Sequence, residues 1–214
     1  MAGQEETGAH WNGAYAHGDD TRSWFEKYPG MSLRMLDAAG VRAADALIDV
    51  GGGASPLTGA LLDRGFGDLT VLDLSAAGMQ HARDRLGSRA GQVHWLAAEV
   101  LSWHPRRRYQ AWHDRAAFHF LTTQEQRQQY RHTLDAATAP GAIAVFGCFA
   151  PDGPQSCSGL PVARYSAAQL ARQAGPGWGL ISQDREEHIT PAGTVQPFTW
   201  AAFRKAPGSR PHVR

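Results

Sequence analysis

Residues 46–56 constrain the fold most, because a short apolar run is followed there by three glycines and a proline. Ala46–Val50 has the length of a buried strand and carries one acid, Asp49. Leu57–Gly65 places leucines at helical spacing, and Pro56 suits the first helical position, where its missing N–H is not needed. Glycines turn the backbone sharply and let a ligand lie against bare main chain. The stretch predicts a strand, a glycine turn and a helix, with which α/β folds bind nucleotides.

A second apolar run, Thr70–Leu72, is followed directly by an acid, Asp73. An acid at the end of the second strand of a βαβ unit is placed to accept hydrogen bonds from ribose hydroxyls. The alternative is that Asp73 only caps the helix that follows it. Because the glycine turn precedes it at the right place, we favour the ribose role.

The glycine pattern distinguishes between classes of nucleotide. A dinucleotide fingerprint, G-x-G-x-x-G, needs a third glycine after Gly51 and Gly53, and Pro56 occupies that place. The chain contains no G-x-x-x-x-G-K-[ST], which excludes a phosphate-binding P-loop. These features suit a nucleoside ligand without a pyrophosphate.

With these two motifs the chain resembles the class I S-adenosylmethionine-dependent methyltransferases. Leu47–Gly53 looks like the first motif of that family and Val71–Ser75 like the second. The resemblance implies a Rossmann-like fold that binds S-adenosylmethionine and releases S-adenosylhomocysteine. It covers roughly residues 44–150 by motif and the rest by layout. The cofactor contacts that it implies in these two motifs are Asp49, Gly51, Gly53, Asp73 and Leu74.

A third strand, Val93–Leu96, leads into Glu99 and Val100. In the resembled family, an acid after this strand accepts a hydrogen bond from the adenine amino group, and Asp is the commoner residue there. The resemblance therefore implies that Glu99 and Val100 contact the cofactor. The alternative is that Glu99 is a capping or solvated residue.

A fourth strand, Ala111–Arg115, is followed by small residues, an aromatic residue and His119. This pattern resembles the fourth motif of small bacterial methyltransferases. We expect the strand to lie beside the first one, at the topological switch point where ligands bind. The titratable groups nearest the transferable methyl are then Asp114 and His119, and we expect both to be catalytic. Asp114 is also a predicted cofactor contact. The alternative for His119 is a packed core residue.

The segment before the first strand is rich in aromatic residues. The spacing places Trp11 and Tyr15 on one helical face, and Trp24 follows a polar stretch. We expect residues 1–43 to form a helical lid, although residues 1–9 are small and polar and are expected to be disordered. In the resembled family such segments fold over the cofactor, so Tyr15 and Trp24 are predicted cofactor contacts. Core packing is the alternative.

An irregular loop, Pro151–Pro161, follows an apolar fifth strand predicted over Ala142–Phe149. Loops at the carboxyl end of a central strand commonly carry function. We hypothesise that the loop forms the substrate wall, with Cys157 or Arg164 contacting the methyl acceptor and Cys157 acting in catalysis. The alternative is a buried, idle thiol.

The alternation of strand and helix patterns predicts the fold class α/β, as a single domain over residues 1–214. Its core, residues 44–205, is expected to be a doubly wound, mostly parallel seven-stranded sheet with helices on both faces. Residues 179–188 and 197–204 are expected to close the sheet as an antiparallel hairpin. Residues 206–214 read as a flexible tail.

Composition excludes several classes of protein. Lys and Arg number 21 against 20 Asp and Glu, which argues against a nucleic-acid binder with a broad basic field. No apolar stretch approaches membrane-spanning length. Two cysteines do not make a disulfide framework, so a reducing cytoplasm is expected. The ten histidines lack metal-ligand spacing, so no metal is expected. Either a monomer or a homodimer is consistent with the sequence.

Three functional interpretations remain open. The first is a methyltransferase that acts on a small molecule, with a thiol, metalloid, hydroxyl or amine as acceptor. The second is a methyltransferase that modifies a protein side chain such as Lys. The third is a non-catalytic adenosyl-binding module. The balanced charge and the apolar, aromatic front segment favour the first. An NAD-dependent enzyme is a distant fourth, because Pro56 breaks the dinucleotide fingerprint.

Overall fold

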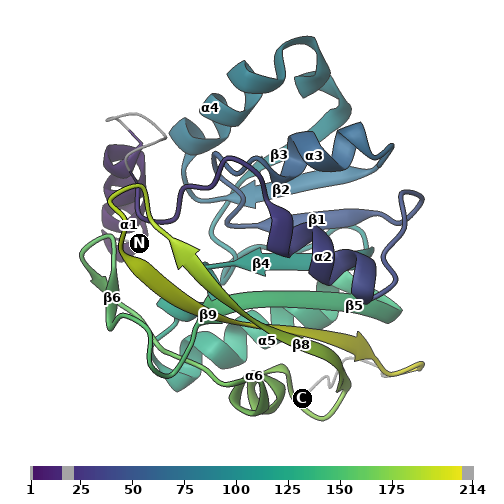
Figure 1. The fold of residues 1–214 in the computed structure, drawn as a ribbon. Coiled ribbons are helices and arrows are strands. Elements are labelled where there is room, and N and C mark those ends of the chain that lie inside the picture. The colour runs from purple at the N-terminus through teal and green to yellow at the C-terminus, as the bar shows by residue number, and fades with distance from the viewer. Residues whose placement is uncertain (1, 16–21, 209–214) are drawn as a thin grey trace.

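The protein is a seven-stranded sheet with helices on both faces in the computed structural model, which describes residues 2–15 and 22–208, with side chains from residue 8 onward (Figure 1). The strand order is β3-β2-β1-β4-β5-β9-β8. The strands of this sheet are β1 Leu47–Val50, β2 Leu69–Asp73, β3 Val93–Ala97, β4 Tyr109–Arg115, β5 Thr138–Phe149, β8 Trp178–Ile189 and β9 Val195–Lys205.

Two hydrophobic cores cover the two faces of the sheet. Helices α2, α3 and α4 contribute to one core, and α5 and α6 contribute to the other. The helices are α1 Ala2–Ala14, α2 Gly30–Ala38, α3 Leu57–Asp63, α4 Ala76–Leu86, α5 Gln124–Ala137 and α6 Ala167–Ala174, with short 3₁₀ turns η1 Gly87–Gln92 and η2 Phe118–Phe120. This arrangement confirms the predicted doubly wound α/β fold.

Strand β1 lies at the topological switch point. It pairs in parallel with β2 on one side and with β4 on the other, so the carboxyl ends of all three strands meet at one edge of the sheet. At the far side, β9 runs antiparallel to both β5 and β8. The predicted C-terminal hairpin is therefore confirmed.

Polar side chains cap the first turns of α4, α5 and α6. Ser75 caps α4 by accepting a hydrogen bond from the Gly78 N–H at 3.0 Å. Thr123 forms a capping box at the start of α5, and Ser166 forms another at the start of α6. These caps satisfy N–H groups that have no partner within the helix.

Two boundaries differ from the sequence predictions by several residues, whereas the predicted tail begins where β9 ends. Helix α1 begins at Ala2, so the expectation of disorder over residues 2–9 was wrong; Ala, Gln and Glu in this stretch have high helix propensity. Strand β5 begins at Thr138, because Gly141, with a φ of 77°, lets the strand continue through an irregularity. Of the predicted tail, residues 206–208 leave β9 without regular structure, and residues 209–214 lie outside the described part of the chain.

The predicted irregular loop contains a small hairpin, β6 Ser156–Cys157 and β7 Leu160–Pro161. The two residues between the strands, Ser158 and Gly159, have φ angles of 51° and 76°. Two positive φ angles in a two-residue connection are typical of a type I′ turn, which matches the twist of paired strands. The loop is therefore held in one shape by its own backbone pairing.

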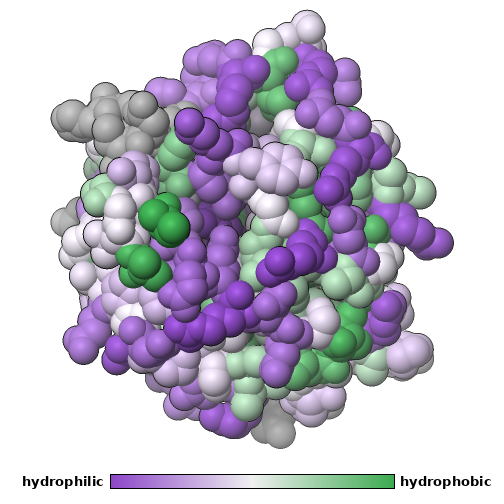
Figure 2. All heavy atoms as spheres, in the orientation of Figure 1, coloured by the Kyte–Doolittle hydropathy of each residue, from purple (hydrophilic) through white to green (hydrophobic). Residues whose placement is uncertain are grey.

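The visible face of the molecule is mostly hydrophilic, with hydrophobic residues in small separate groups (Figure 2). The large hydrophobic side chains that are exposed are Tyr28, Leu180, Ile181, Ile189 and Val195. Among the described residues, none of the helices has the length and apolar character needed to cross a membrane.

A buried hydrogen-bond network joins β4 to α5 and η2. Trp112 Nε1 donates to the Tyr130 hydroxyl at 2.8 Å, and that hydroxyl donates to Asp114 Oδ2 at 2.5 Å. Asp114 Oδ1 accepts hydrogen bonds from the N–H groups of Ala117 and Phe118, both at 3.0 Å. Burial raises the pKa of Asp114 to about 6, although these donors lower it in part. Asp114 is thus satisfied within the core.

We predict that Tyr130→Phe destabilises the fold, because it leaves both Asp114 Oδ2 and Trp112 Nε1 buried without their partner. The expected loss is about 2–3 kcal/mol of unfolding free energy, measured by chemical denaturation. Tyr28→Phe is the matched control, because Tyr28 is 63% exposed, and it should change stability by less than about 0.5 kcal/mol. Equal losses in the two variants would contradict a structural role for the network.

Candidate active site

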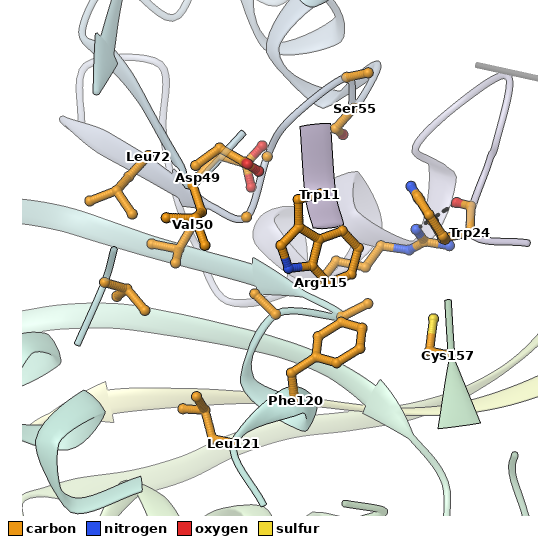
Figure 3. Close-up of a pocket in the computed structure, with 18 of the residues that line it drawn as sticks. Trp11, Trp24, Asp49, Val50, Ser55, Leu72, Arg115, Phe120, Leu121 and Cys157 are labelled. Carbon is orange, nitrogen blue, oxygen red and sulfur yellow. Dashed lines mark hydrogen bonds between the residues drawn. The ribbon is translucent and has the colours of Figure 1, made fainter. Parts of the chain in front are cut away.

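A cavity of about 380 Å³ opens at the carboxyl ends of β1, β2 and β4 (Figure 3). Its volume lies in the range that holds a small molecule or a cofactor. The described residues that line it come from the glycine turn, the ends of β2 and β4, the loop after β3, the front segment and the β6–β7 hairpin. The cavity therefore lies at the predicted switch point.

The glycine turn after β1 needs glycine for steric reasons. Gly51 has a φ of 70°, and a Cβ on it would lie 2.6 Å from the Ala117 Cβ. A Cβ on Gly53 would lie 2.3 Å from the Tyr15 hydroxyl oxygen. Gly51 lines the cavity, whereas Gly53 does not and instead leaves room for Tyr15, which does.

Asp49 lies in β1 directly beside His113 of β4, and both line the cavity. Asp49 Oδ1 is 2.7 Å from His113 Nδ1. Asp49 Oδ2 is buried and has no hydrogen-bond partner among the described residues. A buried carboxylate oxygen without a donor is costly, so this atom is suited to a ligand that carries an N–H group.

Asp73 ends β2 and lines the cavity together with Leu74. Its Oδ1 accepts a hydrogen bond from the Ser75 N–H at 2.6 Å. Burial raises the pKa of Asp73 to about 6, while the N–H groups of Ser75 and Gly53 lower it in part. Ser75 itself caps α4, so Asp73 supports the turn before the helix and also faces the cavity.

Glu99 and Val100 line the cavity just after β3. Glu99 Oε1 also accepts a hydrogen bond from the Leu101 N–H at 3.2 Å, which closes a local turn. Glu99, the residue predicted to contact the adenine, therefore lines the cavity. Its side chain also makes a local hydrogen bond to the backbone, as the capping alternative expected.

The front segment covers the cavity with aromatic side chains. Trp11, Tyr15 and Trp24 line it, and the Trp11 ring lies 4.9 Å from the Phe120 ring in an edge-on arrangement. Helix α1 is tied to the core through Asn12, whose Oδ1 accepts a hydrogen bond from the Ser75 hydroxyl at 2.8 Å. The predicted cofactor contacts Tyr15 and Trp24 thus lie where a ligand would be enclosed.

Neither Asp114 nor His119 is brought to the cavity. Asp114 is held in the core network, on the face of β4 that also carries Trp112. His119 is fully buried between the rings of Phe120 and Phe149, at 4.6 and 4.7 Å. Burial lowers the pKa of His119 to about 3, and its ring nitrogens have no partner among the described residues. Catalytic roles for these two residues stay predictions that the geometry does not support.

Side chains alternate along a strand, so the residues next to Asp114 face the cavity instead. Arg115 lines the cavity with its side chain 10% exposed, and its Nη1 donates to the Trp24 carbonyl at 3.0 Å, as drawn in Figure 3. Arg115 Nη2 is 3.7 Å from Glu26 Oε2. Sequence analysis missed His113, Arg115 and Glu26, although the alternation pattern of β4 could have indicated the first two.

Glu26, which comes from the front segment, lines the cavity next to Arg115. Burial raises its pKa, and the nearby Arg115 charge lowers it in part. Its side chain is 12% exposed, and a single long ion pair with Arg115 is its closest polar contact among the described residues. Glu26 therefore has capacity to accept a proton or a hydrogen bond from a ligand.

Cys157 lines the cavity together with Leu160 and Pro161, all from the β6–β7 hairpin. Burial raises the pKa of the Cys157 thiol, although the hydroxyls of Ser158 and Ser23 and the Arg115 charge lower it in part. The thiol is thus protonated at neutral pH. Arg164 does not line the cavity, because its Nη1 donates to the Gly153 carbonyl at 3.1 Å.

Metal ligation was not expected from the sequence. Across residues 2–15 and 22–208, the structure contains no group of three or more His, Cys, Asp or Glu side chains that could hold a metal ion.

No protein-family model matches the chain, and no curated protein matches it in sequence. Solved structures match it in fold. One, from a study titled "Conversion of a Disulfide Bond into a Thioacetal Group during Echinomycin Biosynthesis", is 20% identical with a TM-score of 0.75, and the match covers 95% of this chain and 94% of that one.

Two further matches are named methyltransferases. The N-methyltransferase NodS from Bradyrhizobium japonicum, in complex with S-adenosyl-L-homocysteine, is 15% identical with a TM-score of 0.71, and the match covers 92% of this chain and 98% of NodS. The 1,6-didemethyltoxoflavin N1-methyltransferase from Burkholderia thailandensis is 16% identical with a TM-score of 0.65, and the match covers 95% of this chain and 90% of that enzyme. The chain therefore has the fold of the class I S-adenosylmethionine-dependent methyltransferases.

Proposed function

We propose that the protein is an S-adenosylmethionine-dependent methyltransferase that acts on a small-molecule acceptor. The observation that carries the proposal is the Asp49 oxygen beside a glycine turn, which has no partner across residues 2–15 and 22–208 and shares one cavity with the Asp73 carboxyl. NodS was solved with S-adenosylhomocysteine, and the toxoflavin enzyme with S-adenosylhomocysteine and its small acceptor. Both have the same fold as this chain, which supports the same class of ligand here.

The residues of the cavity fit this cofactor. Asp73 would accept hydrogen bonds from the ribose hydroxyls, and Glu99 with Leu74 and Val100 would hold the adenine. Asp49 Oδ2 would accept from the ammonium group of the amino-acid tail, next to the bare backbone of the glycine turn. The bound cofactor supplies an activated methyl group whose leaving group needs no proton. The protein's task is therefore to align the acceptor and to exclude water.

The acceptor would lie among Trp24, Phe120, Cys157, Arg115 and Glu26, which line the cavity beyond the glycine turn. Trp24 and Phe120 give this space two aromatic walls, and the front segment closes over it, so the space suits a small molecule better than a protein side chain on a large partner. Glu26 is the group that we propose as the base for an acceptor that arrives protonated. Titratable groups at the acceptor end favour an enzyme over a non-catalytic adenosyl-binding module.

A methylation assay tests the proposal. The protein is incubated with S-adenosylmethionine and a panel of matched aromatic and alkyl thiols, hydroxyls and amines, and S-adenosylhomocysteine release is measured. We expect release that depends on at least one small acceptor and is absent with unfolded histone or other Lys-rich peptides. Turnover with the peptides alone would favour the second interpretation, modification of Lys.

We predict that affinity for S-adenosylhomocysteine depends on the ionisation of Asp73. Because burial raises its pKa to about 6, the carboxylate is ionised and accepts hydrogen bonds above this pH and becomes protonated below it. The Kd measured by calorimetry should be constant above pH 7 and rise by up to about tenfold per pH unit below pH 6.

Asp73→Asn provides the control, because the amide does not titrate. It should bind S-adenosylhomocysteine about tenfold more weakly at pH 7.5, since it loses a charged acceptor, and should lose this dependence on pH. Parallel pH curves for the two proteins would show that Asp73 does not contact the ligand.

We predict that Glu26 faces the position of the transferred methyl. Sinefungin carries an amine at that position, so the Glu26 carboxylate should make it bind more tightly than S-adenosylhomocysteine. Glu26→Gln should reduce this preference by about tenfold or more. Glu187→Gln is the control, because the Glu187 side chain is 55% exposed and does not line the cavity. An unchanged preference in Glu26→Gln would place the methyl elsewhere and remove Glu26 as the base.

A further inference from the structure

A buried chain of hydrogen bonds lies behind the cofactor side of the cavity. It runs from Ser32 in α2 through His113 in β4 to Asp49 in β1, with a Ser32 Oγ to His113 Nε2 distance of 3.0 Å and a His113 Nδ1 to Asp49 Oδ1 distance of 2.7 Å. The three residues are 2%, 1% and 3% exposed. Buried polar side chains are usually hydrogen-bonded, and each of these three takes part in at least one such contact.

The direction of the hydrogen bonds follows from their chemistry. An ionised carboxylate only accepts hydrogen bonds. Nδ1 of His113 must therefore carry a hydrogen and donate a hydrogen bond to Asp49 Oδ1. In the neutral ring, Nε2 then has a lone pair, and the Ser32 hydroxyl is the donor that meets it. The Asp49 carboxylate therefore selects the ring tautomer, and the Ser32 hydroxyl holds the ring in place through Nε2.

The strand register and a neighbouring ring place the His113 side chain beside Asp49. Asp49 and His113 are direct neighbours in the β1–β4 register, and the Trp200 ring lies 6.1 Å from the His113 ring at an angle of 34°. Oδ1 of Asp49 contacts His113, and Oδ2 is buried with no partner in the part of the chain that the structure describes. A Cβ on Gly52 would lie 2.6 Å from Oδ2, so glycine at this position keeps the oxygen open.

We propose that Ser32 and His113 are positioning residues that make the site select ligands with an ammonium group. The proposal rests on the proposed function, in which the ammonium belongs to the amino-acid tail of the cofactor. A fixed, desolvated carboxylate oxygen binds a charged N–H donor far better than a neutral group. Without the His113 donor, Asp49 loses its fixed orientation, and recognition of the tail weakens while recognition of the adenosine remains.

The test compares two ligands by calorimetry. S-adenosylhomocysteine carries the amino-acid tail, and 5′-methylthioadenosine has the same adenosine and sulfur without it. The measured quantity is the ratio of their affinities, for the wild type, His113→Leu, His113→Asn and Ser32→Ala. In Asn the side-chain nitrogen takes the place of Nδ1, so this variant keeps the donor to Asp49 and loses the contact with Ser32.

Thr70→Val is the matched control, because Thr70 is a 1% exposed residue of β2 whose hydroxyl has no partner among the described residues and which does not line the cavity. We expect the affinity ratio to fall by about tenfold or more in His113→Leu. It should be largely restored in His113→Asn, fall a few-fold in Ser32→Ala and stay unchanged in Thr70→Val.

Each other outcome overturns the inference. If His113→Leu weakens both ligands equally, His113 supports the fold alone, and the proposed function stands. If His113→Leu does not fold, Ser32→Ala decides, and an unchanged ratio in that variant removes the positioning role. If the wild type binds neither ligand, the proposed function fails and the inference fails with it.

Discussion

The pairing of β1 with both β2 and β4 is the constraint on which the rest of the structure depends. It brings the ends of three parallel strands to one edge and so places the Asp49 and Asp73 carboxyls around one cavity. Buried carboxyls are costly unless they are paired or hydrogen-bonded. The protein stabilises Asp73 with the Ser75 N–H and Asp49 with the His113 ring, and it leaves one Asp49 oxygen for a ligand.

Strand β4 divides its side chains between stability and the cavity. Trp112 and Asp114 point to one face, where Tyr130 joins them in a core network. His113 and Arg115 point to the other face, where they line the cavity. A one-residue shift of β4 would move each set of side chains to the opposite face of the sheet. Both the core network and the cavity therefore depend on the same register with β1.

The sequence predicted the elements that have strong local signals. The glycine turn, the acid at the end of β2 and the place of β4 beside β1 followed from motifs whose spacing is set by backbone geometry. The cavity positions of Asp49, Gly51, Asp73 and Glu99 are consistent with the resemblance that the motifs carried. The β6–β7 hairpin was predicted only as an irregular loop, because Ser158 at a positive φ is not a strong turn signal.

Side-chain direction was harder to predict than strand position. Asp114 and His119 were assigned to the cavity from the motif alone, and both lie in the core because β4 alternates its faces and the following 3₁₀ turn folds back on β5. Glu26 and Arg115 meet across a sequence separation that no local pattern reports. Long-range contacts of this kind depend on tertiary packing.

The central claim is that the cavity binds S-adenosylmethionine, and calorimetry of the wild-type protein tests it most directly. S-adenosylmethionine, S-adenosylhomocysteine and NAD⁺ are titrated separately under one set of conditions. The account predicts saturable binding of the first two, with one site per chain, and no measurable binding of NAD⁺, because Pro56 occupies the place of the third fingerprint glycine. Binding of NAD⁺ without binding of either sulfur nucleoside would contradict the account.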